Sequence, residues 1–220
     1  MNRTMATRRD FIRNTLVAAA ALPLITSCRS SAFAGDTFSD ILTQIKKNAK
    51  QDVNGEWSGA ISTPVDVSWK TVLSNETDKG EPIEISGTVF QADGKTVAPN
   101  TLIYLYHTDF EGYYGRKKDE HRHGRYRGWM LTDKEGRYSF RTIKAAPYPQ
   151  NRFAAHIHIT LTTVTMKEDW IDSTLFEGDQ LISQRERSMA GQKGGFNPIL
   201  TFEKGKDGVL HATRNIKLMT

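Results

Sequence analysis

The segment PIEISGTVFQADGKTVAPNTLIYLYHTD, residues 82–109, decides the fold. From residue 83 to residue 89, apolar side chains alternate with smaller or polar ones, which is the period of a strand with one buried face. The tetrapeptide ADGK at 92–95 is a turn sequence, and a second apolar run follows directly at 101–107. The segment therefore predicts two short β-strands joined by a turn.

The same form recurs along the chain. The segment 128–143 is built around the turn sequence DKEG, and 154–164 reads as a further strand. The segments 199–204 and 209–218 form a closing pair of strands around GKDG. Short strands, frequent turns and the lack of a long helical period predict an all-β fold, an antiparallel β-sandwich with long loops.

Three segments divide the chain. Residues 1–34 form an export segment, residues 35–74 an irregular, polar N-terminal arm, and residues 75–220 the β-sandwich. The arm contains one amphipathic stretch, SDILTQIKKNAK at 39–50, which predicts a short helix.

The export segment carries a twin arginine, Arg8 and Arg9, followed by Phe11 and an apolar stretch from residue 15 to residue 25. This pattern resembles the twin-arginine signal of bacteria, which directs the export of folded proteins. The alternative is a short amphipathic or membrane-anchoring helix, but the apolar run is shorter than the roughly 20 residues that a span requires. We therefore expect a protein that is exported to the periplasm or held at the membrane.

Two processing sites compete at the end of this segment. LITSC resembles a lipobox with Cys28 as the lipidated first residue, whereas AFA before Gly35 resembles an ordinary signal-peptidase site. Cys28 is the only cysteine, so no intrachain disulfide can form. Its position favours a lipid anchor at Cys28, and cleavage after Ala34 stays the alternative.

The positive charge of the chain lies largely in the export segment. The formal net charge is +5, and residues 1–27 contain four arginines and one aspartate, which is a net +3. The remainder is near neutral, so the charge gives no support for a nucleic-acid partner.

Two of the six histidines, His156 and His158, lie one residue apart in the predicted strand 154–164. Residues i and i+2 of a strand point to the same face, about 7 Å apart along the chain. Neutral imidazoles bind zinc, copper, iron and nickel, although a structural pair has the same spacing. A second pair, His121 and His123, lies in the charged stretch DEHRHGRYRG, which favours a solvated turn.

Tyrosines accompany the first histidine pair. Tyr148 lies between two prolines in AAPYPQ, and Tyr113 and Tyr114 follow a strand end in TDFEGYYGRKKD. Phenolate is a hard anionic ligand, so two histidines and two tyrosines favour a hard trivalent metal, Fe(III). Such a metal would lower the pKa of the tyrosines far below the ordinary value of roughly 10.

The stretches GTVFQADGKTVAPNTLIYLYHTDFEGYYGRKKD, RGWMLTDKEGRYSFRTIKAAPYP, AAHIHITL and LFEGDQL resemble the intradiol ring-cleavage dioxygenases. The resemblance runs from about residue 83 to residue 182 and is greatest to the protocatechuate 3,4-dioxygenase chains. The order Tyr, Tyr, His-x-His carries it. The strand-turn-strand pattern alone also resembles transthyretin-like modules, so a surface binding module is the second hypothesis.

The resemblance implies that Tyr114, Tyr148, His156 and His158 bind Fe(III), and that Tyr113 lines the pocket. It also implies that a catechol-type substrate displaces Tyr148 and binds iron through both oxygens. Oxygen is then inserted between the two hydroxylated carbons to give a muconate-type diacid. Association into a homo-oligomer stays open.

Two positions depart from the family pattern. Phe153 stands where the family commonly has an arginine that helps to stabilise the charge on the substrate, and Ser173 stands in place of a glutamine. Arg152, one residue earlier, is the catalytic candidate, but neighbouring strand residues face opposite ways, so it reaches the ring only if a bulge redirects it. These departures leave open an iron-binding relative without turnover.

Four arginines near the expected mouth of the site either pair with a substrate carboxylate or form a solvated positive face: Arg122, Arg125, Arg127 and Arg152.

Overall fold

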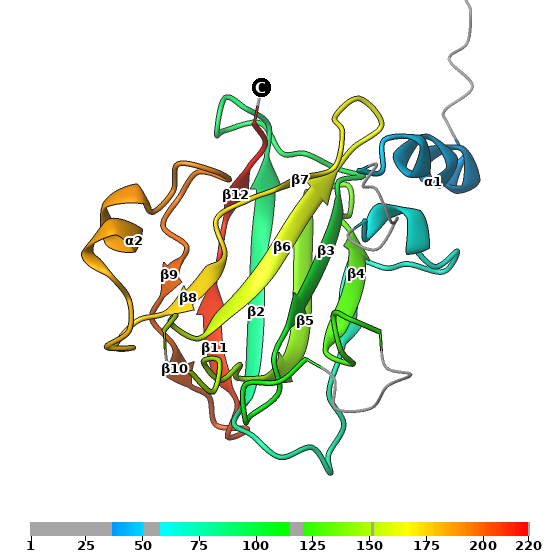
Figure 1. Ribbon diagram of the computed structural model, residues 1–220. Coiled ribbons are helices and arrows are strands. Elements are labelled where there is room, and N and C mark those ends of the chain that lie inside the picture. Colours follow the sequence, from blue (N-terminus) through cyan, green and yellow to red (C-terminus); the bar gives the residue numbers. More distant parts are fainter. Residues whose placement is uncertain (1–36, 51–57, 115–120, 151, 220) are drawn as a thin grey trace, which may run out of the picture. The chain divides into compact units, whose positions relative to one another are not determined.

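The computed structural model describes residues 37–50, 58–114, 121–150 and 152–219 (Figure 1). The helical elements are α1 (Phe38–Lys47), the 3-10 turn η1 (Ala60–Ser62) and α2 (Gln184–Met189). The strands are β1 (Lys70–Val72), β2 (Pro82–Phe90), β3 (Leu102–His107), β4 (Arg127–Leu131), β5 (Arg137–Ile143), β6 (His156–Thr162), β7 (Asp169–Trp170), β8 (Thr174–Phe176), β9 (Ile199–Leu200), β10 (Glu203–Lys204), β11 (Leu210–Thr213) and β12 (Ile216–Lys217).

The strands form two sheets that share one core. One sheet has the order β1-β5-β2-β11-β10, with β12 also on β2, and the other has the order β4-β3-β6-β8-β9, with β7 on β6. Ile83 and Ile85 of β2 are fully buried in the same cluster as Ile103 of β3 and Ile157 of β6. Burial of each such side chain stabilises the folded state by about 1.5–3 kcal/mol. The fold is therefore stabilised when the apolar face of each sheet covers that of the other. The all-β prediction is confirmed.

The expectation of antiparallel sheets is only partly correct, because both sheets are mixed. β1 is parallel to β5, β11 and β12 are parallel to β2, and β8 is parallel to β9. An alternating apolar pattern specifies which face of a strand is buried but not the direction of its neighbour. β11 and β12 lie one after the other along the same side of β2 and are interrupted at Arg214. Gly87 of β2 faces this interruption, and a Cβ there would lie 1.9 Å from the carbonyl oxygen of Arg214.

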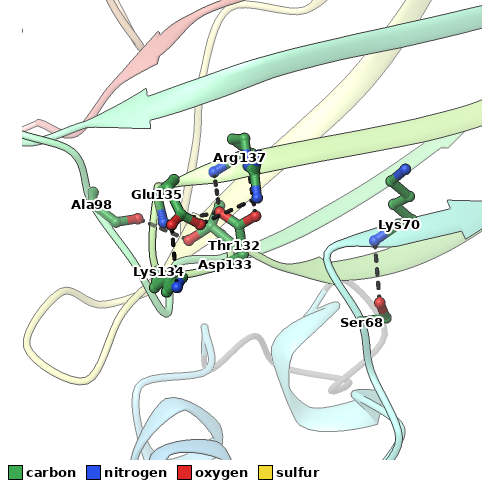
Figure 2. Close-up of polar contacts among 8 residues, drawn as sticks. All are labelled: Ser68, Lys70, Ala98, Thr132, Asp133, Lys134, Glu135 and Arg137. Atoms are coloured by element: carbon green, nitrogen blue, oxygen red, sulfur yellow. Dashed lines mark hydrogen bonds and ion pairs between the residues drawn. The ribbon is translucent and has the colours of Figure 1, made fainter.

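Of the three predicted strand pairs, β10 and β11 around GKDG form an antiparallel hairpin, as predicted, whereas the other two pairs are not hairpins. β2 and β3 lie in different sheets, and so do β4 and β5, so that both connections cross from one sheet to the other. Figure 2 shows the second crossing, in which the carboxylate of Asp133 accepts hydrogen bonds from the backbone of Glu135 and from the backbone and Nε of Arg137. The Thr132 hydroxyl donates to the carbonyl of Ala98 at 2.8 Å and thereby joins this crossing to the first one.

The N-terminal arm contains the predicted helix as α1. Thr37 and Asp40 form a capping box at its start, with reciprocal hydrogen bonds of 3.2 and 3.1 Å. Leu42 and Ile45 are the buried residues of the helix, in a small cluster with Leu102 of β3. Within the described ranges, no helix is long and apolar enough to cross a membrane.

A buried carboxylate holds the arm. Glu168, 4% exposed, accepts hydrogen bonds from the Ser58 hydroxyl at 2.5 Å, from the backbone of Gly59 at 2.9 Å and from the Thr160 hydroxyl at 2.9 Å. It also accepts from the backbone of Ala60 and of Lys50. A carboxylate has about four lone-pair sites, so these five donors occupy all of them and three donors share Oε1.

We expect Glu168→Gln to lower the free energy of unfolding by about 2 kcal/mol, because the amide NH₂ would face donors and leave one of them unsatisfied. Urea denaturation measures the change. Glu177→Gln is the matched control, since Glu177 forms an exposed ion pair with Arg187 that contributes little. Equal losses in the two variants would contradict a special contribution of Glu168.

A second buried polar group makes stability depend on pH. His107 is fully buried, with Nδ1 donating to the Thr108 carbonyl at 2.7 Å and Nε2 lying 2.8 Å from the Thr142 hydroxyl. Burial lowers the pKa of His107 to about 4 from 6.5. As the pH falls below 6.5, the unfolded chain binds a proton that the folded chain does not, so stability is lost between those two values.

Proton binding by His107 in the unfolded chain should lower the free energy of unfolding by about 1 kcal/mol when the pH falls from 7.5 to 5.5. Urea titrations at both pH values, on wild type and on His107→Asn, isolate the contribution of His107 to the pH dependence. The variant should be less stable overall yet lose less stability on acidification, and an unchanged pH dependence would contradict the prediction.

Candidate metal centre and adjoining cavity

β6 presents two imidazoles on one face. His156 and His158 alternate with the buried Ile157, and their Nε2 atoms lie 3.1 Å apart. β6 pairs with β3 so that His158 lies opposite Tyr106, and with β8 so that His156 lies opposite Leu175. The strand period thus places both histidines together, as the sequence predicts.

Two phenols meet these imidazoles. The hydroxyl oxygens of Tyr114 and Tyr148 lie 2.8 Å apart, and the Tyr148 oxygen lies 3.2 Å from Nε2 of His156. The loop before Tyr114 packs against the loop of Tyr148 at Gly112, where φ is +87° and a Cβ would lie 2.1 Å from the carbonyl oxygen of Pro147. A glycine is required there, because any side chain would separate the two tyrosine loops.

The hydrogen bonds of the histidines prepare one nitrogen of each as a ligand. Nδ1 of His156 donates to the Ala154 carbonyl at 2.7 Å, which leaves the lone pair on Nε2, toward the phenols. Nδ1 of His158 lies 3.3 Å from the Ser173 hydroxyl. Burial, followed by the charges of His156 and His123, lowers the pKa of His158 to about 3, so the ring is neutral, as metal binding requires.

The donor set fits a hard cation. Burial and the hydrogen bond with Tyr148 raise the pKa of Tyr114, so without a metal it is a phenol, and an adjacent cation would favour the phenolate. The described residues contain no group of three or more His, Cys, Asp or Glu side chains arranged to hold a metal. The candidate set is the two imidazoles and two phenols, because their contacts of 2.8–3.2 Å bring the ligand atoms together, and this set suits Fe(III).

A cavity of about 590 Å³ adjoins these ligands. Its walls include an aromatic box in which Trp170 lies edge-on to Tyr106 and to His158, with centroids 5.8 and 5.7 Å away. The volume is that of a small-molecule site. The lining residues are Tyr106, Tyr114, Arg122, His123, Tyr148, His158 and Trp170.

The second histidine pair is not simply a solvated turn, contrary to the interpretation of the sequence. His121 is exposed, but His123 is 2% exposed and lines the cavity. The ring of His123 stacks on Tyr106 with centroids 3.8 Å apart and an angle of 4°. The charged neighbours in the sequence concealed this burial. Sequence reasoning likewise missed Tyr106, which lies in the apolar run of β3, and Trp170 of β7, for which β3 gave no signal.

The four arginines differ in position. Arg122 lines the cavity, whereas Arg125 pairs with Asp78 at 2.5 Å and Arg127 donates to the carbonyl of Gly124. Arg152 is exposed and is not among the cavity-lining residues, so the structure does not bring it together with the four predicted ligands. Its catalytic assignment stays a prediction.

The remaining sequence-predicted positions lie around the site. Tyr113 is 46% exposed and does not line the cavity. Phe153 is 56% exposed, and its ring lies edge-on to Tyr148 at 6.2 Å. Ser173 contacts His158, as described above.

Comparison with known proteins identifies the family. Residues 59–194 match the family described as Dioxygenase. The chain belongs to the intradiol ring-cleavage dioxygenases. Over 124 residues this intradiol dioxygenase chain is 32% identical to the protocatechuate 3,4-dioxygenase beta chain of Burkholderia cepacia, and the aligned segment covers 52% of each protein. Over 106 residues it is 32% identical to catechol 1,2-dioxygenase 2 of Acinetobacter lwoffii, covering 46% of this chain and 38% of that protein.

The chain thus spans about half or less of the length of these curated relatives.

Solved structures show the same fold. Catechol 1,2-dioxygenase from Acinetobacter sp. ADP1 superposes with a TM-score of 0.53 and 17% identity, covering 70% of this chain and 57% of that one. The dioxygenase domain of a carbohydrate-binding fusion protein from Streptomyces sp. SirexAA-E gives a TM-score of 0.52 and 19% identity, covering 70% and 89%. The resemblance inferred from the sequence is confirmed.

Proposed function

We propose that this intradiol dioxygenase chain is an exported, Fe(III)-dependent enzyme that cleaves a catechol-type ring with O₂ to a muconate-type diacid. One observation carries the proposal: four candidate metal-ligand atoms, from Tyr114, Tyr148, His156 and His158, are linked by contacts of 2.8–3.2 Å beside a cavity of small-molecule size. The names of the relatives support the substrate class.

These four side chains would hold the iron, which when bound activates a catechol toward O₂. The chain's own residues do the rest. Tyr106 and Trp170 offer apolar faces to the ring of the substrate and exclude water from it. Tyr148, whose oxygen lies within reach of both Tyr114 and His156, would as a phenolate accept the proton of a substrate hydroxyl.

Purified protein expressed with iron tests the proposal by its visible spectrum and by oxygen uptake across a panel of catechols. A reddish protein that consumes oxygen and yields a muconate-type product supports it. A colourless protein that binds no iron would contradict it and would favour a binding module. A coloured protein without oxygen uptake would contradict the turnover and favour an iron-binding relative, in keeping with Phe153 and Ser173.

The export proposal rests on residues 1–34, which lie outside the described residues. If the twin arginine directs export, changing Arg8 and Arg9 together to lysine should leave precursor in the cytoplasm. If Cys28 carries a lipid, Cys28→Ala should move the mature protein from the membrane fraction to the soluble periplasmic fraction. Fractionation with immunodetection measures both, and a distribution that neither variant changes would refute export and anchor alike.

A further inference from the structure

An arginine is buried at the interruption between β11 and β12. Arg214 is 2% exposed, and its guanidinium donates to the hydroxyl of Thr174 and to the main-chain carbonyl of Asp172. In the described parts of the chain these two neutral oxygens are the hydrogen-bond acceptors of the guanidinium. Taking a cation out of water costs free energy that neutral acceptors offset only in part. A purely stabilising role therefore does not account for this residue.

The main chain of Arg214 is fixed in one sheet and its side chain bonds to the other. Its N–H donates to the carbonyl of Ser86 on β2 at 2.8 Å, and its own carbonyl accepts from the hydroxyl of Tyr138 on β5 at 2.7 Å. The two acceptors of the guanidinium belong to the segment 172–174, where β8 of the second sheet begins. Arg214 therefore ties this segment to β2 and β5.

Ser173 lies between the two residues that Arg214 holds, and it faces the proposed metal ligands. Thr174 is fully buried and lies opposite Ile157 of the core in the pairing of β8 with β6. Neighbouring side chains of an extended segment point to opposite faces, so Ser173 points away from the core, to the face that carries His158. Its hydroxyl lies 3.3 Å from Nδ1 of His158. A hydroxyl both donates and accepts, so it can bond Nδ1 in either tautomer of the ring, and it accepts from Nδ1 when Nε2 binds a metal.

We propose that Arg214 is a positioning residue of the candidate metal centre: it fixes the segment 172–174 and thereby holds Ser173 where its hydroxyl orients the imidazole of His158. This inference rests on the proposed function, because it assumes that His158 is a metal ligand. It extends that function to a buried side chain of the opposite sheet, which contacts none of the four candidate ligands. Removal of a group that orients a ligand histidine typically lowers metal affinity 10–100-fold.

Arg214→Met replaces the guanidinium by an apolar side chain and removes both of its hydrogen bonds. The affinity for iron should fall about tenfold, measured by titrating iron-free protein with Fe(III) against a competing chelator. The urea midpoint of the iron-free variant should stay near that of wild type, because the lost hydrogen bonds are offset by no longer burying a charge. Arg187→Met is the matched control, since Arg187 is an exposed arginine paired with Glu177, and it should leave the iron affinity unchanged.

A double-variant cycle tests whether Arg214 acts through Ser173. Ser173→Ala should lower the iron affinity by a similar factor, and Ser173→Thr, which keeps the hydroxyl, should retain most of it. If Arg214 acts by holding this hydroxyl, Arg214→Met should cause little further loss in protein that already carries Ser173→Ala. The same titration measures all of these variants.

An iron affinity that Arg214→Met leaves unchanged would overturn the inference, whether or not the urea midpoint falls, and so would losses that add in the double variant. If Arg214→Met does not fold, Thr174→Val removes one acceptor at nearly constant shape and decides by the same cycle with Ser173→Ala. Wild type that binds iron without consuming oxygen would contradict the proposed turnover, while the losses of affinity would still support the role of Arg214. Wild type that binds no iron would overturn the candidate metal centre and this inference together.

Discussion

Replacing His156 by alanine should lower the iron affinity of the purified protein at least a hundredfold and abolish its visible band. The imidazole of His156 is held by the Ala154 carbonyl and contacts both Tyr148 and His158, so its removal deletes one of four proposed ligands and the partner that orients another. Tyr114→Phe should have a similar effect, because an aromatic ring without the oxygen cannot serve as a ligand. Iron content by elemental analysis, together with the spectrum, measures both losses.

His121→Ala is the matched control for this experiment. His121 is an exposed histidine of the second pair and does not line the cavity, so its removal should leave the iron content unchanged. Circular dichroism of all three variants verifies the fold. Equal iron loss from His121→Ala and His156→Ala would contradict the assignment of the metal to His156 and its three proposed partners.

Tyr148→Phe should separate iron binding from turnover. Tyr148 is proposed to bind iron at rest and to leave when the substrate binds, so the variant should keep most of its iron while its visible band shifts through the loss of one phenolate. Oxygen uptake with catechols should fall about a hundredfold, near the lower end of what a positioned proton acceptor contributes, which corresponds to about 2.7 kcal/mol. The spectrum and oxygen uptake are recorded on the same preparations.

An unshifted spectrum would show that Tyr148 is not a ligand. A shifted spectrum with wild-type oxygen uptake would show instead that Tyr148 binds iron but takes no part in turnover. Phe153→Ala serves as the control for the packing of this loop, since the ring of Phe153 is exposed and contacts Tyr148 only edge-on.

The part of the site that lies on one strand could be predicted from the sequence. The spacing of His156 and His158 determines that both point to one face, whatever the strand pairs with. Tyrosines near the histidines were candidates from the sequence, but the choice of Tyr114 and Tyr148 came from family resemblance. No local rule states that loops 34 residues apart along the chain will meet. Their meeting depends on Gly112 and Pro147, whose close contact is visible only in three dimensions.

The rest depended on tertiary structure. Period-two alternation predicted the buried faces of β2 and β5 but not that the turns beside them cross between sheets. His123 stands among charged residues, and its burial follows from the neighbouring rings of Tyr104 and Tyr106 rather than from its own segment. Arg152, selected because it precedes the position of the family's arginine, is exposed, while Arg122, about 30 residues earlier in the sequence, lines the cavity.

The parallel pairing of β11 and β12 with β2 has a consequence for the order of events during synthesis. Ile83 pairs with Leu210 and Val89 with Ile216, so one side of β2 has no neighbour until residues 210–217 have left the ribosome. Contacts between such distant residues close late and slow folding. Until then β2 presents an open strand edge, the kind of surface on which chains aggregate. A chain cut before residue 210 keeps that edge permanently and should accumulate as inclusion bodies, even though every proposed metal ligand is still present.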